Sequence, residues 1–249
     1  MNTYIDIENK AKNHIINMNM LYESEIRYSI DNSRIYRNID CIYDNSFTTN
    51  KNIVISVVSC KTDDAVFMFN SSDNICVLNF ASYKYPGGGF INGSLAQEES
   101  LCYVSTLYNV ISSDKFKLDY EYNRNHTNGG LYEHFAIYSP NIVFENSKSE
   151  IKLVDVITCP APNLSCYKGS NELYNKTLRE RIKMILDIAI VNNVKTLILG
   201  AFGCGVFKND PVVVVKMFKD VIHSYRYNFD NIVFAIPYGY NHSCFNKIF

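Results

Sequence analysis

The sequence predicts an α/β fold, in which a mixed central sheet lies between two helical layers, and three observations support this. Five short apolar runs rich in β-branched residues are typical of buried strands. Helical patterns separate most of these runs, which is the β-α-β rhythm of a parallel or mixed sheet with helices on both faces. No internal repeat and no linker rich in Pro, Gly or Ser divides the chain. We therefore expect one domain over residues 1–249.

The strands and helices of this core can be placed in order along the chain. Strands are expected at 52–59, 74–81, 152–159, 194–202 and 231–238. Helices are expected at 62–69, 171–193 and 210–227, with Thr62 and Asp210 as N-caps and Pro211 at the first helical position of the last.

The remaining segments are less regular. Residues 134–145 are expected to form two short strands broken at Pro140, at an edge of the sheet or in an irregular connection. Residues 112–133 are polar and end in two glycines, so we expect a long loop or flap, a feature that is often functional. Residues 1–50 are polar with scattered apolar positions, which predicts a helical extension packed outside an α/β core of residues 51–249.

Composition narrows the possible functions. The chain has 249 residues and is 47% hydrophobic, enough to bury a full core. With 24 basic and 25 acidic side chains and no block of like charge, it lacks the electrostatic pattern of a duplex nucleic-acid or anionic membrane surface. No stretch approaches 18 uncharged apolar residues and no apolar leader stands at the N-terminus, so we expect an intracellular protein without a membrane span.

The cysteines and histidines do not predict a metal site. The eight cysteines are scattered singly, without a CxxC pair and without a histidine at ligand spacing: Cys41, Cys60, Cys76, Cys102, Cys159, Cys166, Cys204 and Cys244. We expect reduced thiols and neither a metal nor a cofactor.

Two glycine-rich loops follow predicted strands, at the sheet edge where α/β proteins bind ligands. The first is PGGGFINGSLAQEES (86–100), in which Ser94 and Gln97 match a capping box at the start of a helix. The second is LGAFGCGVFKNDP (199–211). Either loop alone could be a tight connection, but two together favour binding of a diphosphate by backbone N–H groups. Neither is a Walker A or a G-x-G-x-x-G motif.

The first loop ends in adjacent glutamates. If a helix runs from about Leu95 to Ile111, its apolar stripe places Glu98 on the buried side and Glu99 toward the edge of that stripe. Favourable first-turn charge would explain Glu99 better than Glu98, because a buried carboxylate is costly without a partner. Beside a diphosphate, a carboxylic acid with a raised pKa suits glycosyl chemistry, in which it protonates a leaving oxygen and then activates water.

The motif GGG-x7-QEE, together with LNFASYKYPGGGF, VITCPAPNL and LGAFGCGVFKNDP, resembles the microbial-type poly(ADP-ribose) glycohydrolases over about residues 50–240. The resemblance implies a macrodomain-like fold and metal-free hydrolysis of the ribose-ribose bond. It implies Glu99 as the acid/base, with Glu98 and Asn79 at the ribose hydroxyls. The other implied substrate-binding residues are Gly87, Gly88, Gly89, Phe90, Gln97, Gly203, Cys204, Gly205 and Phe207. Two features depart from the family pattern: Lys208 stands where a small residue is usual, and segment 112–133 has no counterpart.

Three functions remain open at this level. The first is a poly(ADP-ribose) glycohydrolase, whose partners are the polymer or other ADP-ribosylated macromolecules and whose product is ADP-ribose. The second is a hydrolase that removes single ADP-ribose units from protein or nucleic acid, and the third is a reader that binds ADP-ribose without turnover. The QEE pair favours the first, and two intact glutamates speak against the third. A monomer is expected.

Overall fold

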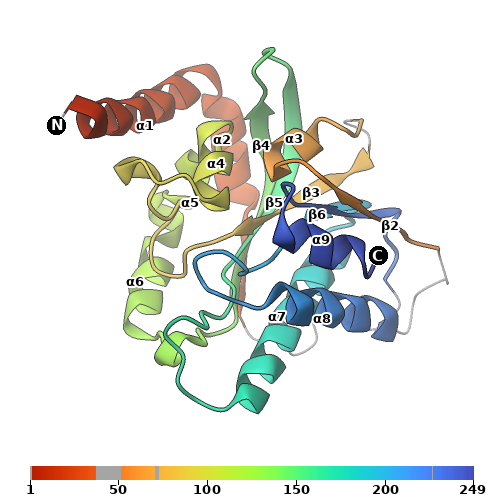
Figure 1. Cartoon of the computed structure of the whole chain (residues 1–249). Coiled ribbons are helices and arrows are strands. Elements are labelled where there is room, and N and C mark those ends of the chain that lie inside the picture. Colours follow the sequence, from red (N-terminus) through yellow and green to blue (C-terminus); the bar gives the residue numbers. More distant parts are fainter. Residues whose placement is uncertain (1, 38–51, 71–72, 226) are drawn as a thin grey trace.

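The computed structural model describes residues 2–37, 52–70, 73–225 and 227–249, with the backbone alone for residues 2–8. Its centre is a sheet whose described strands have the order β1-β4-β5-β3-β6-β7-β2 (Figure 1). Their bounds are β1 Arg34–Arg37, β2 Val54–Val58, β3 Ile75–Phe80, β4 Phe135–Glu145, β5 Ile151–Cys159, β6 Thr196–Leu199 and β7 Asn231–Ala235. All five core strands predicted from the sequence are confirmed; four are shorter than predicted, and β5 begins one residue earlier.

The sheet is mixed, as expected. Strands β5, β3, β6, β7 and β2 run parallel, whereas β4 pairs antiparallel with β5, and β1 pairs antiparallel with β4. The edge strand β1 lies within the segment predicted to be purely helical and outside the sheet, so that part of the prediction is wrong. Its four residues, RIYR, are too few and too polar for a strand pattern; pairing with β4 makes them a strand.

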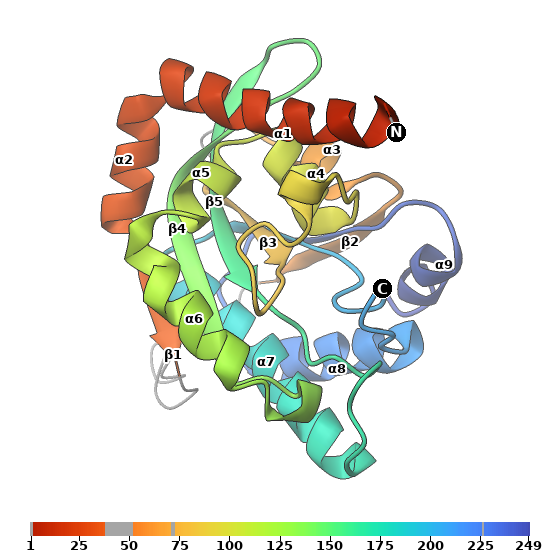
Figure 2. The same cartoon turned by 90° about the vertical axis from the view of Figure 1, so that its left-hand side faces the viewer.

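Helices cover both faces of the sheet, in two layers (Figures 1 and 2). One layer holds α1 Asn2–Leu21, α2 Glu23–Asn32, α3 Thr62–Val66, α4 Gln97–Tyr103, α5 Leu107–Ile111 and α6 Lys117–Asn125. The other holds α7 Asn171–Val191, α8 Pro211–Ser224 and α9 Tyr240–Asn246. Short 3-10 turns occur at η3 Phe90–Asn92, η4 Asp114–Phe116 and η5 Asn128–Gly130. Residues 38–50 of the predicted extension, including Cys41, lie outside the described residues.

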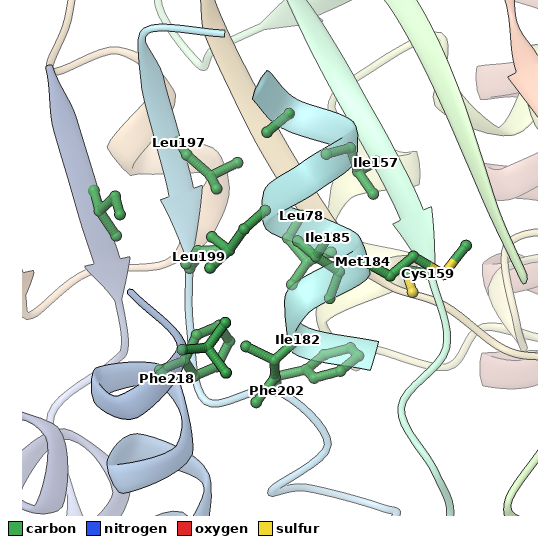
Figure 3. Close-up of a cluster of buried hydrophobic side chains, with 14 of the residues drawn as sticks. Leu78, Ile157, Cys159, Ile182, Met184, Ile185, Leu197, Leu199, Phe202 and Phe218 are labelled. Carbon is green, nitrogen blue, oxygen red and sulfur yellow. The ribbon is translucent and has the colours of Figure 1, made fainter. Parts of the chain in front are cut away.

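Alternation along the strands divides the interior into two cores. On β3, Val77 faces the α1–α6 layer and Leu78 faces the α7–α9 layer, because successive strand side chains point to opposite faces. Figure 3 shows the second core, where Leu78, Leu197 and Leu199 of the sheet lie against Ile182 and Ile185 of α7. This three-layer arrangement is the one that the sequence predicts.

Helix starts follow the expected chemistry at α8 but not at α3. The Asp210 carboxylate accepts a hydrogen bond from the Val212 N–H at 2.8 Å, and Pro211 occupies the first helical position. Thr62, predicted as an N-cap, is instead the first residue of α3, and its hydroxyl accepts a hydrogen bond from the Gln97 side chain at 3.3 Å.

The helix predicted from Leu95 to Ile111 is broken into α4 and α5. At the break, the Thr106 N–H donates to the Val143 carbonyl and the Glu145 N–H donates to the Val104 carbonyl, so β4 takes over bonds that a continuous helix would make. The Ser105 hydroxyl donates to the Leu101 carbonyl at 2.7 Å. Backbone hydrogen bonds to β4 therefore replace the hydrogen bonds that a continuous helix would form here.

Two other segments also differ from expectation. Residues 134–145 form one strand rather than two, with a register shift between Ser139 and Ile142 that absorbs Pro140, and this strand is not at the edge of the sheet. The segment 112–133, expected as a loop, contains η4, α6 and η5. Burial of Phe116 in η4 and of Tyr120 and Asn123 on one face of α6 explains why this polar sequence is ordered.

Candidate active site

The candidate site lies at the carboxyl ends of β3 and β6, where the two strands separate. They pair only as far as Val77 and Ile198, and the chain then leaves β3 toward the α1–α6 layer and β6 toward α8. Such a switch point is where open α/β sheets bind ligands.

Gln97 closes the gap between the two strands. Its amide nitrogen donates to the Leu78 carbonyl at 2.8 Å, and its amide oxygen accepts from the Phe80 N–H at 2.8 Å. Both groups belong to the edge of β3 that β6 leaves unpaired. The predicted capping box of Ser94 and Gln97 is therefore wrong: α4 begins after Ala96, without a side-chain cap. The Gln97 amide is hydrogen-bonded to β3 instead of capping a helix, and Gln97 also lines the pocket.

The two glutamates follow Gln97 in the first turn of α4, and both are buried, with exposed fractions of 3% for Glu98 and 7% for Glu99. Each oxygen of Glu98 has one hydrogen-bond donor: Oε1 accepts from the Asn79 amide at 3.2 Å, and Oε2 accepts from the Ser82 N–H at 2.7 Å. Glu99 uses only Oε1, which accepts from the Gly89 N–H at 2.8 Å. Its Oε2 is buried and has no partner among the described residues.

Burial has a strong electrostatic effect on Glu98. Desolvation raises the pKa of this carboxyl from 4.5 to about 8, and the nearby charge of Glu99 adds to the rise. Hydrogen bonds from Ser82 and Asn79 oppose it. The raised pKa favours the protonated form of Glu98 at neutral pH.

Asn79 links the pair to the sheet. It stands near the end of β3, and its amide nitrogen also lies 3.3 Å from the hydroxyl oxygen of Thr158 on β5. Its Oδ1 is buried and has no partner in the described part of the chain. Buried polar atoms nearly always find a partner in the working molecule, so Asn79 Oδ1 and Glu99 Oε2 mark a place for ligand or water.

The triple glycine fits around these carboxylates. Gly88 has a left-handed φ of +57°, and a Cβ there would lie 2.6 Å from Glu99 Oε1 and 3.0 Å from Glu98 Oε2. At Gly89, a Cβ would lie 2.3 Å from the Ser94 hydroxyl oxygen. Gly87 packs on the ring of Tyr108. The triple glycine thus lets the backbone approach Glu99 and donate to it.

A pocket of about 400 Å³ is lined by Gln97 and Ser100, the residues on either side of the two glutamates in α4, but not by the glutamates themselves. Its lining is mainly apolar, as is usual for ligand sites. It comes from the ends of β3 and β7, the start of α4, and the second glycine loop: Lys61, Thr62, Asp63, Phe80, Leu95, Ala96, Gln97, Ser100, Ala161, Ala201, Gly203, Gly205, Val206, Phe207, Ala235, Ile236, Pro237 and Asn241. Lys61, Asp63 and Asn241 are polar residues of this lining that no sequence motif indicated.

The second glycine loop is held in place by Asn209. Its amide donates to the Gly203 carbonyl at 3.2 Å and to the Pro162 carbonyl at 3.0 Å. Gly203 has φ +73°, and a Cβ there would lie 2.4 Å from the Asn209 amide nitrogen, whereas Gly205 faces open space. Burial raises the pKa of the Cys204 thiol to about 12, so the thiol stays protonated and is a poor nucleophile.

An aromatic group that sequence reasoning missed borders the site. Tyr83 stacks on Tyr132 with ring centres 4.3 Å apart, and Phe207 meets Tyr132 edge-on at 6.0 Å. Tyr132 has a left-handed φ of +58°, and buried Arg181 donates to its carbonyl at 3.3 Å and to that of Glu133 at 3.0 Å. No local pattern could have revealed this, because the residues come from four separate segments.

The predicted site residues therefore divide into four groups. Glu98, Glu99, Asn79, Gly88 and Gly89 come together around the carboxylate pair, and Gln97, Gly203, Gly205 and Phe207 line the pocket. Cys204 and Gly87 lie alongside without lining it. Phe90 is separate: its ring is fully buried and packs on Tyr103 and Tyr108, so it faces the core.

Two further properties bear on the chemistry. Within the described ranges, no group of three or more His, Cys, Asp or Glu side chains is placed to hold a metal ion. Among the same residues, no helix is both long and apolar enough to cross a bilayer.

The fold has three layers, with a buried carboxylate pair at the switch point of its sheet. This combination defines a macrodomain-like protein. Residues 7–146 match the family model of the microbial-type PARG catalytic domain, more than half of the chain. The chain belongs to this family of poly(ADP-ribose) glycohydrolases. A search of curated protein sequences finds no match.

Solved structures agree with the family match. A poly(ADP-ribose) glycohydrolase from Thermomonospora curvata superposes with a TM-score of 0.84 at 28% identity, over 91% of this chain and 89% of that one. The same protein bound to the inhibitor ADP-HPD gives a TM-score of 0.80 at 28% identity, over 91% and 88%. A poly(ADP-ribose) glycohydrolase from Deinococcus radiodurans in complex with ADP-ribose gives 0.79 at 28% identity, over 90% and 96%.

Proposed function

We propose that this protein hydrolyses the ribose-ribose bonds of poly(ADP-ribose) and releases ADP-ribose, with Glu99 as the acid/base. The observation that carries the proposal is Glu99 Oε2, which is buried and has no partner among the described residues, while Oε1 accepts a hydrogen bond from the Gly89 N–H. A carboxyl group with one oxygen anchored and the other free is oriented for proton transfer. Family membership and the ADP-ribose complex of the Deinococcus radiodurans relative support the choice of substrate.

The reaction begins with proton transfer from Glu99 to the leaving ribose oxygen as the glycosidic bond breaks. This proton is assigned to Glu99 Oε2, the oxygen of that carboxyl without a partner among the described residues. The cationic sugar centre that forms is attacked by water, and Glu99 takes the proton that this water loses, which restores the starting state.

Glu98 and Asn79 hold the sugar in this scheme. Asn79 Oδ1 has no partner within the described chain and accepts a hydrogen bond from a ribose hydroxyl. Glu98 lies within hydrogen-bond distance of the same amide, at 3.2 Å, and accepts from a second hydroxyl. The diphosphate lies along the second glycine loop, where Gly203 and Gly205 leave the backbone uncovered, and Phe207 packs against the terminal ribose.

Replacement of Glu99 by glutamine tests the proposal. Glutamine keeps the oxygen that accepts from Gly89 but removes the titrating proton, so single-turnover release of ADP-ribose should fall by about 10²- to 10⁴-fold. Calorimetric affinity for ADP-ribose should survive. Glu98→Gln should reduce both turnover and affinity, with a rate loss no greater than that of Glu99→Gln. Glu172→Gln, at an exposed position on α7, is the matched control. A Glu99→Gln protein that cleaves at the wild-type rate contradicts the proposal.

The substrate is tested by giving the wild-type protein labelled poly(ADP-ribose) and, separately, a mono-ADP-ribosylated protein. Release from the polymer alone is the expected result. Release from the modified protein alone would favour the mono-ADP-ribosyl hydrolase, and binding of ADP-ribose without release from either would identify a reader.

A further inference from the structure

The end of α6 is attached to the loop that leads into the triple glycine. The Arg124 guanidinium lies 5.6 Å from the centre of the Tyr85 ring, within the range of a cation–π interaction. Its Nη1 donates to the Lys84 carbonyl at 3.1 Å. Lys84, Tyr85 and Arg124, hereafter the α6 cluster, thus form one surface from two distant segments.

This surface is exposed and positively charged. The Tyr85 side chain is 55% exposed, and Lys84 and Arg124 are also exposed. Among the described residues, no carboxylate lies within ion-pairing distance of either cation; Glu121, one turn earlier on α6, makes no ion pair with Arg124. Proteins bind single-stranded polyanions that carry bases with surfaces of this kind. The exposed aromatic ring stacks on a base, and cations without an ion-pair partner among the described residues attract the charged backbone.

The cluster also adjoins the catalytic carboxylates. The Tyr85 carbonyl accepts a hydrogen bond from the Gly88 N–H at 3.1 Å. Gly88 is the residue whose Cβ would lie 2.6 Å from Glu99 Oε1. A single turn of backbone therefore separates the exposed ring from Glu99, and Gln97, two residues before Glu99, lines the apolar pocket.

We propose that the α6 cluster binds the next ADP-ribose unit of the polymer, beyond the unit in the pocket, with Arg124 and Lys84 at its diphosphate and Tyr85 against its adenine. This inference rests on the proposed function. Each unit of the polymer carries a diphosphate and a planar base, which match two cations and one exposed ring. The segment 112–133 supplies Arg124 to the cluster and so helps to determine how the polymer approaches Glu99.

The test compares binding of ADP-ribose with binding of poly(ADP-ribose) of defined length, in the Glu99→Gln protein so that no substrate is consumed. Arg124→Gln and Lys84→Gln should each weaken polymer binding by about 3- to 10-fold at low salt, and each should lower the slope of log affinity against log salt by about 0.7. Tyr85→Leu should weaken polymer binding by about fivefold or more. Affinity for ADP-ribose itself should not change. Arg124→Lys, which keeps the charge, should retain most polymer affinity.

Lys216→Gln, an exposed cation on α8 in the opposite layer, is the matched control and should change neither affinity. Equal polymer affinity in Arg124→Gln and Lys216→Gln would overturn the inference. A parallel loss of ADP-ribose affinity would also overturn it, because the cluster would then only shape the glycine loop. Single-stranded RNA is a third probe, and a loss of affinity confined to that RNA would likewise overturn the inference. If the Glu99→Gln protein binds neither ADP-ribose nor polymer, the proposed function itself fails.

Discussion

Gly88→Ala should inactivate the protein at a modest cost in stability. The alanine Cβ would lie 2.6 Å from Glu99 Oε1 and 3.0 Å from Glu98 Oε2, both shorter than an ordinary contact. Either the carboxylates or the glycine loop must move, and the hydrogen bond from the Gly89 N–H to Glu99 is strained with them.

The size of each effect follows from the geometry. A left-handed φ of +57° costs an alanine about 1–2 kcal/mol, or about 2–8 °C in Tm for a chain of this length. Relief of the short contact requires a shift of about 0.5–1 Å at Glu99, and misplacement of a reacting group by 1 Å costs about 100-fold in rate. The rate loss should therefore far exceed what partial unfolding could explain.

Gly129→Ala is the control that separates the effect of backbone strain from the effect of displacing the carboxylates. Gly129 has nearly the same φ, +61°, but a Cβ there would meet nothing within 4 Å. It should lower Tm by a similar amount and leave activity unchanged. Thermal melts give the stability of both variants, and single-turnover release of ADP-ribose gives their rates. Equal rates in the two variants would refute the idea that Gly88 exists to make room for the carboxylates.

Three further predictions concern pH, the second glycine loop and metals. Because the folded state raises the pKa of Glu98 from 4.5 to about 8, it holds an extra proton between these values, so the free energy of unfolding should fall as pH rises from about 5 to 8. Glu98→Gln should flatten this dependence in melts across the range; an unchanged slope would show that other groups cause it. Lys208 has a left-handed φ of +60°, so Lys208→Gly should stabilise the protein by about 0.5–1 kcal/mol, seen as a rise in Tm of about 1–4 °C. A fall in Tm would mean that the lysine side chain stabilises the loop. Chelator should leave turnover unchanged, since no metal-binding group of side chains is found in the described ranges; activity lost to chelator and restored by zinc or magnesium would contradict this.

The break between α4 and α5 is a feature that the helical spacing of apolar residues does not predict. Leu101, Val104, Tyr108 and Ile111 have helical spacing, and nothing in their order indicates an interruption at Ser105. The interruption comes from β4, whose Val143 and Glu145 exchange backbone hydrogen bonds with Val104 and Thr106. A partner about 40 residues away in the chain cannot be inferred from local pattern.

The glutamates show the same limit within the site. Spacing correctly placed Glu98 on the buried side of the helix, but it also placed Glu99 toward the edge, where first-turn surface charge would explain it. In the fold Glu99 is buried as well, because the triple glycine turns back over it and donates the Gly89 N–H. Burial of a carboxylate depends on what covers it, and here the cover is a loop.

The sequence by itself determined the five core strands, the layered α/β architecture, the two glycine loops and the carboxylate pair, because alternation, glycine and helix-cap preferences are local properties of the chain. The tertiary structure alone decided which of these meet. It assigned Gln97 to the unpaired edge of β3 rather than to a helix cap, turned Phe90 into the core, and assembled Tyr83, Tyr132 and Phe207 beside the pocket. These outcomes depend on contacts between residues distant in sequence, which form only when the strands separate and the helices pack on both faces of the sheet.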